Sequence, residues 1–532
     1  MSQTKTRVEI YDTTLRDGTQ AEGVSLSLED KLMIAERLDA FGVDYIEGGY
    51  PLSNPKDEAF FVQIRKHPIR HARIAAFGMT RRKGVKVAED SGMQALLGSE
   101  APVITIVGKS WPMHVKDVLR ASKRENLDMI AESLALMAEH GREAIFDAEH
   151  FFDGYQSDSE YAMQTLEVAL QAGATCLVLC DTNGGSLPEH VSHVVKDVRQ
   201  RFGDARLGIH CHNDSGLAVA NSLAAVAAGA RHVQGTINGI GERCGNADLT
   251  SIVPDLVLKC GYECLKGDTL ADLTEVSRYV YEVANLPLRG NQPFVGMAAF
   301  AHKGGMHVHA VRRNSATYEH VDPATVGNRR RVLISELAGA TNVAIKIDKR
   351  FNVDQDKQLQ RKVLLAVQDM EKEGYQFEAA EASFELLVRK ILGGKWYRQF
   401  WELDHYRCVI LQTTEGRSSS EATVKLCIGG EFFHTVAEGD GPVNALDAAL
   451  RKALLRHCPT IEKLQLVDYK VRVVNPREGT AARVRVVIEF HDTVCGYFGT
   501  VGVDENIIQA SWRALTDAIE YKLLNEREQE DS

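Results

Sequence analysis

The sequence predicts a closed (β/α)8 barrel, followed by helical linker subdomains and then by a C-terminal α+β domain. Within the first 240 residues, eight short runs rich in β-branched and apolar residues recur about 32 residues apart, the length of one strand plus one helix. This alternation stops near residue 275, and beyond residue 405 strand-like segments follow one another directly. We therefore expect a barrel over residues 1–275, linker subdomains over 276–395 and a third domain over 396–532.

The barrel strands are expected where apolar and β-branched residues cluster. Amphipathic segments separate them, and in residues 27–41 Ser27 matches an N-cap, Asp30 follows three residues later, and Gly42 ends the predicted helix. A doubly wound open sheet, the alternative fold, needs a G-x-G-x-x-G motif after the first strand, where the chain reads DTTLRDGTQ. The eight predicted strands cover residues 7–12, 43–47, 73–77, 103–107, 144–149, 175–181, 206–212 and 232–237.

The C-terminal domain is predicted to repeat one unit, in which several strands precede a helix. Residues 285–330 are expected to form loops and short helices, and the charged stretch 331–394 is expected to be helical, for example over 354–372. Gly439, Gly441, Glu478 and Gly479 fall at expected turns. Strands are predicted at 409–413, 422–428 and 431–437 before a helix over 442–455, and at 465–474, 482–492 and 495–503 before a helix over 506–524.

Composition limits the classes of partner that the chain could have. Hydrophobic residues make up 44% of the sequence and charged residues 25%, which excludes a mainly disordered protein. The formal net charge of -11 provides no overall positive field, so neither nucleic acid nor an anionic membrane is expected as a partner. The sequence has no signal-peptide pattern and no run of about 18 apolar residues, which favours a cytoplasmic protein without a transmembrane helix.

The cysteines are expected to be reduced and buried. There are ten of them without a C-x-x-C pair, which predicts neither a zinc ribbon nor a disulfide framework. Cys176, Cys180, Cys211 and Cys244 have apolar neighbours in the sequence, as buried free thiols commonly do.

Chemistry in a barrel of this kind is expected where the strands end. His210 and His212 are alternate residues of the seventh predicted strand, so both imidazoles face one side, and Cys211 faces the helices. Two histidines and a carboxylate form a common divalent-metal set, in which Asp17 can supply the carboxylate and Asn246 a further oxygen. An H-x-H pair alone is more often a core or surface pair, but its place at a strand end favours the metal site.

Three further residues have both a structural and a chemical interpretation. Arg16 fits either an ion pair at the barrel mouth or a fixed cation that stabilises a developing oxyanion. Glu149 ends an apolar strand, so it is either a paired polar clamp or a base. His307 lies in the segment FAHKGGMHVH, which could deliver an acid or a base from a flexible loop.

Basic clusters at residues 81–83 and 329–331 are expected to be solvated, with a coenzyme phosphate contact as the less favoured alternative.

Four separate motifs stand in one order along the chain: DTTLRDGTQ, HCHND, GERCGNADL and FAHKGGMH. Together they resemble the family of metal-dependent Claisen-condensing barrel enzymes, which includes the 2-isopropylmalate, homocitrate and citramalate synthases. The three-part layout matches as well, so the resemblance covers essentially the whole chain. The stretches QAEGVSLSLEDKL, YIEGGYPLSNPKD, FDAEHFFDGY and LCDTNGG are most similar to the (R)-citramalate synthase branch.

The resemblance implies a metal site at the barrel mouth. Asp17, His210 and His212 would hold a divalent cation, with Asn246 in or near its ligand shell. Magnesium, manganese and zinc all suit such a mixed set of nitrogen and oxygen ligands.

The resemblance also implies a substrate pocket and a group for proton transfer. Arg16 would steady the oxygen of a keto acid, and Thr182 and Glu149 would line the pocket. His307 and Tyr318 match the linker residues that the family uses in deprotonation.

The implied function is the condensation of acetyl-CoA with pyruvate to citramalate, an acyltransferase step toward isoleucine, in a homodimer that isoleucine inhibits through the C-terminal domain. The pair Glu149-His150 and the triplet His307-Val308-His309 depart from the isopropylmalate pattern and argue against a plain 2-isopropylmalate synthase. A sister synthase for another keto acid, either 2-isopropylmalate or homocitrate synthase, remains an alternative. A retro-aldol acyl-CoA lyase would have no need of the C-terminal domain. An amino-acid-binding protein with an inactive barrel is the alternative from a different class.

Overall fold

The structure is a computed structural model, and it describes residues 6–303, 305–332, 351, 357–412, 418–475, 479 and 481–530. The chain forms two compact units. The first comprises Met1–Phe300 together with Glu319–Arg330, and the second comprises Ala301–Tyr318 together with Arg331–Ser532. The predicted domain boundaries at residues 275 and 395 stay predictions.

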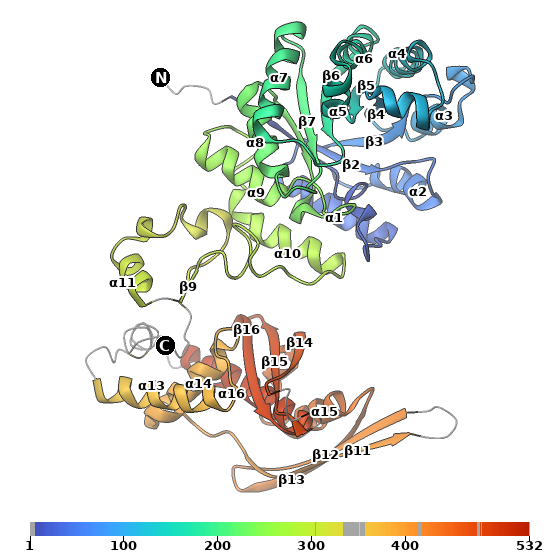
Figure 1. Cartoon of the computed structure of the whole chain (residues 1–532). Coiled ribbons are helices and arrows are strands. Elements are labelled where there is room, and N and C mark those ends of the chain that lie inside the picture. The colour runs from blue at the N-terminus through green and yellow to red at the C-terminus, as the bar shows by residue number, and fades with distance from the viewer. Residues whose placement is uncertain are drawn as a thin grey trace. The chain divides into compact units, whose positions relative to one another are not determined.

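Eight parallel strands of the first unit close into a barrel, in which β1 pairs with both β2 and β8 (Figure 1). The predicted (β/α)8 barrel is therefore confirmed, and the open doubly wound sheet is excluded. The strands are β1 (Glu9–Asp12), β2 (Tyr45–Gly49), β3 (Arg73–Met79), β4 (Val103–Lys109), β5 (Glu143–Glu149), β6 (Ala174–Asp181), β7 (Leu207–Cys211) and β8 (His232–Gly235).

The helices of the first unit begin and end at the residues that local chemistry favours. Ser27 and Asp30 form both halves of a capping box at the start of α1, and Gly42 ends the helix with a φ of 91°. The helices are α1 (Leu28–Phe41), α2 (Pro55–Ile64), α3 (Ser91–Gly98), α4 (Lys123–Glu139), α5 (Phe151–Ser157), α6 (Ser159–Gln171), α7 (Pro188–Phe202), α8 (Ala218–Ala228), α9 (Leu249–Pro254) and α10 (Leu273–Val283). Short 3-10 or π turns are η1 (Gly18–Gln20), η2 (Val87–Glu89), η3 (His114–Val118), η4 (Ile237–Gly239), η5 (Asp255–Lys259), η6 (Leu270–Asp272) and η8 (Pro323–Val326).

Successive side chains of each barrel strand point alternately inward and outward, so the barrel has an inner and an outer layer of core. Ile10, Ile46 and Ile104 pack outward against the helices, and Cys211 belongs to the same outer layer, as predicted. Cys244 is exposed, so its prediction as a buried thiol is wrong, because it lies in the loop after β8 rather than in a core element. The apolar interior cluster consists of Tyr11, Tyr45, Ala75, Val103, Ile145, Cys176, Val178 and Cys180.

The second unit contains the predicted repeat. Each antiparallel three-stranded sheet is followed by a helix that covers one of its faces. The first half consists of β11 (Glu402–Gln412), β12 (Ser418–Ile428), β13 (Glu431–Gly439) and α15 (Pro442–Leu454), and the second half of β14 (Gln465–Val473), β15 (Val484–Asp492), β16 (Gly496–Asp504) and α16 (Ile507–Glu530).

The rest of the second unit precedes this repeat. The flexible loop predicted around His307 is wrong, because this segment forms a two-residue strand and a helix; the helix agrees with the short helices expected over residues 285–330. Predicted positions 354, 413 and 478 lie outside the described residues. The elements are β9 (Ala301–His302), α11 (Gly305–Arg313), η7 (Ser315–Thr317), β10 (Arg331–Val332), α13 (Lys357–Lys372), α14 (Glu381–Leu392), η9 (Gly394–Trp396) and η10 (Pro459–Lys463).

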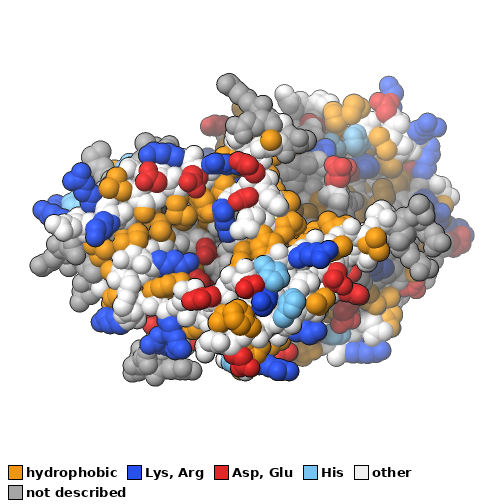
Figure 2. Space-filling view, turned by 90° about the horizontal axis from the view of Figure 1, so that it is seen from below, with side chains coloured by type: hydrophobic (Ala, Val, Ile, Leu, Met, Phe, Trp, Pro, Cys, Tyr) orange, Lys and Arg blue, Asp and Glu red, His pale blue; other side chains and the backbone are white. Residues whose placement is uncertain are grey.

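Apolar side chains remain exposed on the strands of both C-terminal sheets. Ile410 and Leu411 of β11 are 60% and 58% exposed, and Val467 and Val473 of β14 are 48% and 49% exposed. Figure 2 shows hydrophobic side chains at the surface between charged groups of both signs. Among the described residues, no helix combines the length and the apolar character needed to cross a bilayer.

Candidate metal and active site

Three potential metal ligands converge at the barrel mouth. Nε2 of His210 lies 3.5 Å from Oδ2 of Asp17, and Nε2 of His212 lies 4.0 Å from the same oxygen. The two Nε2 atoms are 3.3 Å apart, and all three residues are buried. The strand order explains this convergence, since β7 and β1 both pair with β8 in the closed barrel.

The electrostatics of this cluster favour the protonation states that bind a metal. Burial lowers the pKa of His210, and burial together with His210 lowers the pKa of His212 to about 4. Burial would raise the pKa of Asp17, but the Arg16 guanidinium and the two imidazoles outweigh it and lower that pKa to about 2. At neutral pH the cluster therefore holds one carboxylate and two neutral imidazoles.

Unpartnered buried atoms provide a test of whether the cluster fits a cation. Among the described residues, Oδ1 of Asp17 and Oδ1 of Asn246 are buried and have no hydrogen-bond donor. Leaving a buried acceptor unpaired costs about 1–3 kcal/mol, so such atoms require an explanation. The 3.3 Å between the two imidazole nitrogens also matches two ligands about 2.1 Å from one ion. The residues present fit a divalent cation.

Asn246 is brought to this cluster by a glycine-rich loop after β8. Its backbone pairs with that of His212, and its side chain contacts Asp17. Gly241 and Gly245 have φ values of 157° and 93°. A Cβ at Gly241 would collide with the amide of Asn246, and one at Gly245 with the carbonyl of Gly239. The loop therefore needs glycine at both positions to hold the asparagine in place.

Arg16 is held beside the cluster on three sides. Its Nε donates to Glu47 over 2.6 Å, its Nη1 donates to Asp17 over 3.1 Å, and its guanidinium lies 3.8 Å from the centroid of the Phe77 ring. The ion-pair interpretation from the sequence is thus confirmed. The side chain keeps 12% of its surface exposed, so an oxygen of a small ligand could still reach a fixed positive charge.

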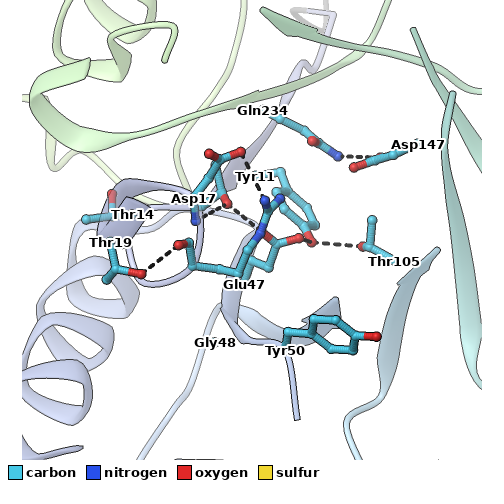
Figure 3. Close-up of polar contacts among 12 residues, drawn as sticks. Tyr11, Thr14, Asp17, Thr19, Glu47, Gly48, Tyr50, Thr105, Asp147 and Gln234 are labelled. Carbon is cyan, nitrogen blue, oxygen red and sulfur yellow. Dashed lines mark hydrogen bonds and ion pairs between the residues drawn. The ribbon is translucent and has the colours of Figure 1, made fainter. Parts of the chain in front are cut away.

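Glu47 is a residue of this site to which the sequence analysis gave no role. Its carboxylate accepts hydrogen bonds from Tyr11 over 2.7 Å, from Thr13 and from Arg16 (Figure 3). It is fully buried, and the signal that could have found it is a lone carboxylate within the buried strand β2. The carboxylate fixes the direction in which the Arg16 guanidinium points.

The predicted pocket residues Glu149 and Thr182 lie close to one another. Glu149 forms an ion pair with Lys109 at the end of β4, and ligand atoms of His114, Glu149 and His150 lie within 4.8 Å of one another. The hydroxyl of Thr182 accepts a hydrogen bond of 2.8 Å from the backbone of His150, whose φ is 53°. Nothing in the local sequence marks Lys109 or His114 as a site residue, because neither belongs to a recognisable motif.

His307 and Tyr318 belong to the second unit, whereas Asp17, His210 and His212 belong to the first. The rings of His307 and Tyr318 stack with centroids 4.2 Å apart, and both side chains are exposed. An exposed imidazole beside a phenol can take up and pass on a proton.

Comparison with known proteins covers all three parts of the chain. Residues 7–280 match the HMGL-like family, residues 294–374 the homocitrate synthase post-HMGL domain-like family and residues 378–523 the LeuA allosteric (dimerisation) domain. An (R)-citramalate synthase of Aquifex aeolicus is 52% identical over 98% of this chain and 99% of its own length, and one of Geobacter sulfurreducens is 50% identical over 99% of both. A 2-isopropylmalate synthase of Methanocaldococcus jannaschii is 32% identical over 98% of this chain and 96% of its own.

Proposed function

Since this chain belongs to the HMGL-like family and, within it, to the (R)-citramalate synthases, we propose that it condenses acetyl-CoA with pyruvate and hydrolyses the thioester, giving (R)-citramalate and free CoA. One observation carries the proposal: the cluster of Asp17, His210 and His212 occurs in a chain that matches proteins of that name from end to end. The reaction is an acyltransferase step in which the acetyl group becomes part of an alkyl chain.

The residues that would hold the metal are Asp17, His210 and His212, with Asn246 contributing an oxygen. A divalent cation bound there supplies Lewis acidity toward the keto oxygen of pyruvate. Magnesium, manganese or zinc would each suit the ligand set. The pKa directions of these groups support binding near neutral pH, since proton competition is weak there.

Arg16 is proposed to stabilise the oxygen that becomes negative as the new carbon–carbon bond forms. Its guanidinium is anchored by Glu47 and Asp17, so little reorganisation is needed when the charge develops. Glu149 and Thr182, from the ends of β5 and β6, are proposed to line the substrate pocket.

Proton removal from the acetyl methyl group is proposed for His307 and Tyr318, and the Glu149 carboxylate is proposed to take part as well. The resulting carbanion equivalent attacks the keto carbon of pyruvate, and the keto oxygen gains the proton. Water then adds to the thioester, and the bond to sulfur breaks, which releases CoA as a thiol. This release makes the reaction effectively irreversible and gives a direct assay.

A panel of keto acids with acetyl-CoA tests the proposal through the rate of thiol release. We expect pyruvate to give the highest kcat/KM. A preference for 2-ketoisovalerate or 2-oxoglutarate would make the protein a sister synthase instead. Absence of thiol release with every acceptor, in protein that binds an amino acid, would support the inactive-barrel alternative.

The C-terminal unit is proposed to form a homodimer and to bind isoleucine as an inhibitor, in a protein that works in the cytoplasm. The match to an allosteric (dimerisation) domain and the exposed apolar strands of both sheets support the dimer and a regulatory role for this unit. Initial rates titrated with isoleucine, leucine and valine test the regulation, and a flat response to all three would contradict it. Light scattering tests the dimer.

A further inference from the structure

We propose that Gln234 and Asp147 form a positioning relay that holds the His210 imidazole as its Nδ1–H tautomer, so that the lone pair of Nε2 faces Asp17. The inference rests on the proposed metal site and adds two residues that the sequence analysis did not consider. Neither residue is a ligand, and both act through His210.

The relay is a chain of two hydrogen bonds inside the barrel. Gln234 of β8 lies opposite His210 of β7 in the strand register, and its Oε1 is 2.9 Å from Nδ1 of His210. The other end of the amide, Nε2, donates to Oδ1 of Asp147 on β5 over 3.0 Å (Figure 3). Gln234, Asp147 and His210 are 0%, 3% and 5% exposed, so bulk solvent competes little for these hydrogen bonds.

The two ends of a primary amide differ, and this difference carries the argument. The NH2 group can only donate and the carbonyl oxygen can only accept. Because the NH2 group of Gln234 is turned toward the Asp147 carboxyl oxygen, its carbonyl oxygen is left to face His210. A carbonyl oxygen requires a proton on Nδ1, and a neutral imidazole with that proton carries its lone pair on Nε2.

The position of Nε2 of His210 also supports a lone pair, rather than a proton, on that nitrogen. It lies 3.5 Å from Oδ2 of Asp17 and 3.3 Å from Nε2 of His212, which is the convergence point of the proposed ligands. His212 provides a contrast, since its Nδ1 is buried without a hydrogen-bond partner among the described residues. The relay therefore orients one of the two imidazoles and leaves the other to be set by the ligand it binds.

Nitrogen-15 NMR of metal-free protein labelled at histidine tests the tautomer directly. We expect the His210 signals, assigned by their loss in His210→Gln, to report a proton on Nδ1 and none on Nε2. A proton on Nε2 would mean that the Gln234 amide is turned the other way and would overturn the relay. This measurement uses the unaltered chain, so it decides the question even if a relay variant fails to fold.

Calorimetric titration with Mn2+ tests the consequence for metal binding. Gln234→Met keeps the volume but removes the acceptor, and we expect its Mn2+ affinity to fall about 10–100-fold. Gln234→Glu retains an oxygen toward Nδ1 and should recover most of that loss, a rescue that a merely structural role would not produce. Asp147→Asn, which can still accept from Gln234, should bind Mn2+ more tightly than Asp147→Leu.

The matched control is Asn126→Leu, which removes another buried amide of the barrel that bonds to Lys109 and Tyr161. We expect it to change the Mn2+ affinity less than threefold. If Gln234→Met binds Mn2+ as tightly as the unaltered protein, the relay is wrong and the metal site stands. If the unaltered protein binds no Mn2+, the metal site is wrong, and the relay falls with it.

Discussion

The two ends of the barrel use the same kinds of residue in opposite ways. At the amino ends of the strands, Arg206 donates to Glu9 over 3.1 Å and to Glu143 over 2.5 Å, and His232 contacts Glu9 over 3.4 Å. At the carboxyl ends, Arg16, Asp17 and two histidines also meet, but there the potential ligand atoms of Asp17, His210 and His212 all lie within 4.8 Å of one another. We call these sets the floor cluster and the mouth cluster.

A buried charge cluster indicates function when its groups converge without satisfying one another. In the floor cluster each acid has a guanidinium from the protein, which stabilises the fold, although Nε of Arg206 and Nε2 of His232 are buried without a hydrogen-bond partner among the described residues. In the mouth cluster Asp17, His210 and His212 bring a carboxylate oxygen and two imidazole nitrogens to one place. Their arrangement costs stability unless a cation binds, so it indicates a ligand site rather than a structural clamp.

Substitution of the matched histidines is the sharpest way to break this comparison. His210→Ala should lower kcat about a thousandfold or more and abolish Mn2+ binding, since Lewis acidity contributes several kcal/mol to such a reaction. His232→Asn, in the floor cluster, should instead lower the free energy of unfolding and keep the kcat of the folded protein. Thiol release and urea unfolding measure the two effects, and equal losses of kcat in both variants would remove the distinction.

The matched arginines should show a smaller but parallel contrast. Arg16→Ala should lower kcat about 100–1000-fold, as the loss of a preorganised oxyanion partner does, while Mn2+ still binds. Arg206→Ala should leave kcat near its original value and lower the free energy of unfolding by about 1–3 kcal/mol, because Glu9 loses its guanidinium and Glu143 keeps only that of Arg73. Near-native turnover of Arg16→Ala would contradict the proposed role of the guanidinium.

Glu47 should affect kcat only by positioning Arg16, so its substitution should lower kcat by a smaller factor than substitution of Arg16. Glu47→Gln keeps the shape of the side chain but weakens the hydrogen bond from Arg16 Nε, and we expect kcat to fall about 10–100-fold with little change in Mn2+ affinity. Glu143→Gln serves as the floor control and should change only the unfolding curve. A Glu47→Gln enzyme with full kcat would show that Phe77 and Asp17 position Arg16 without it.

The pH dependence of stability should be the smallest effect. The pKa of His212 is about 4 in the folded chain against 6.5 for the ordinary group, so between these values the unfolded chain binds more protons. The free energy of unfolding of metal-free protein should therefore fall as the pH falls from about 6.5 to about 4. His212→Gln should flatten this decline, and identical slopes in urea titrations with a chelator present would contradict it.

Much of the fold follows from local sequence patterns. The recurrence of apolar runs predicted every barrel strand to within a few residues, and the Ser27–Asp30 capping box and Gly42 were readable because their contacts span only a few residues. The period-two pattern of His210-x-His212 placed both imidazoles on one side for the same reason. Such patterns act within one element, so they can be recognised without knowledge of the rest of the chain.

Local sequence patterns are sufficient to predict the elements, their order and the residue types at the strand ends. They do not reveal which of these residues are partners, which emerges from the folded barrel: Glu47 with Arg16 across 31 positions, Glu149 with Lys109 across 40, and Gln234 with Asp147 across 87. Hydrogen bonds and ion pairs need contact within a few ångströms, and barrel closure and strand register set those distances.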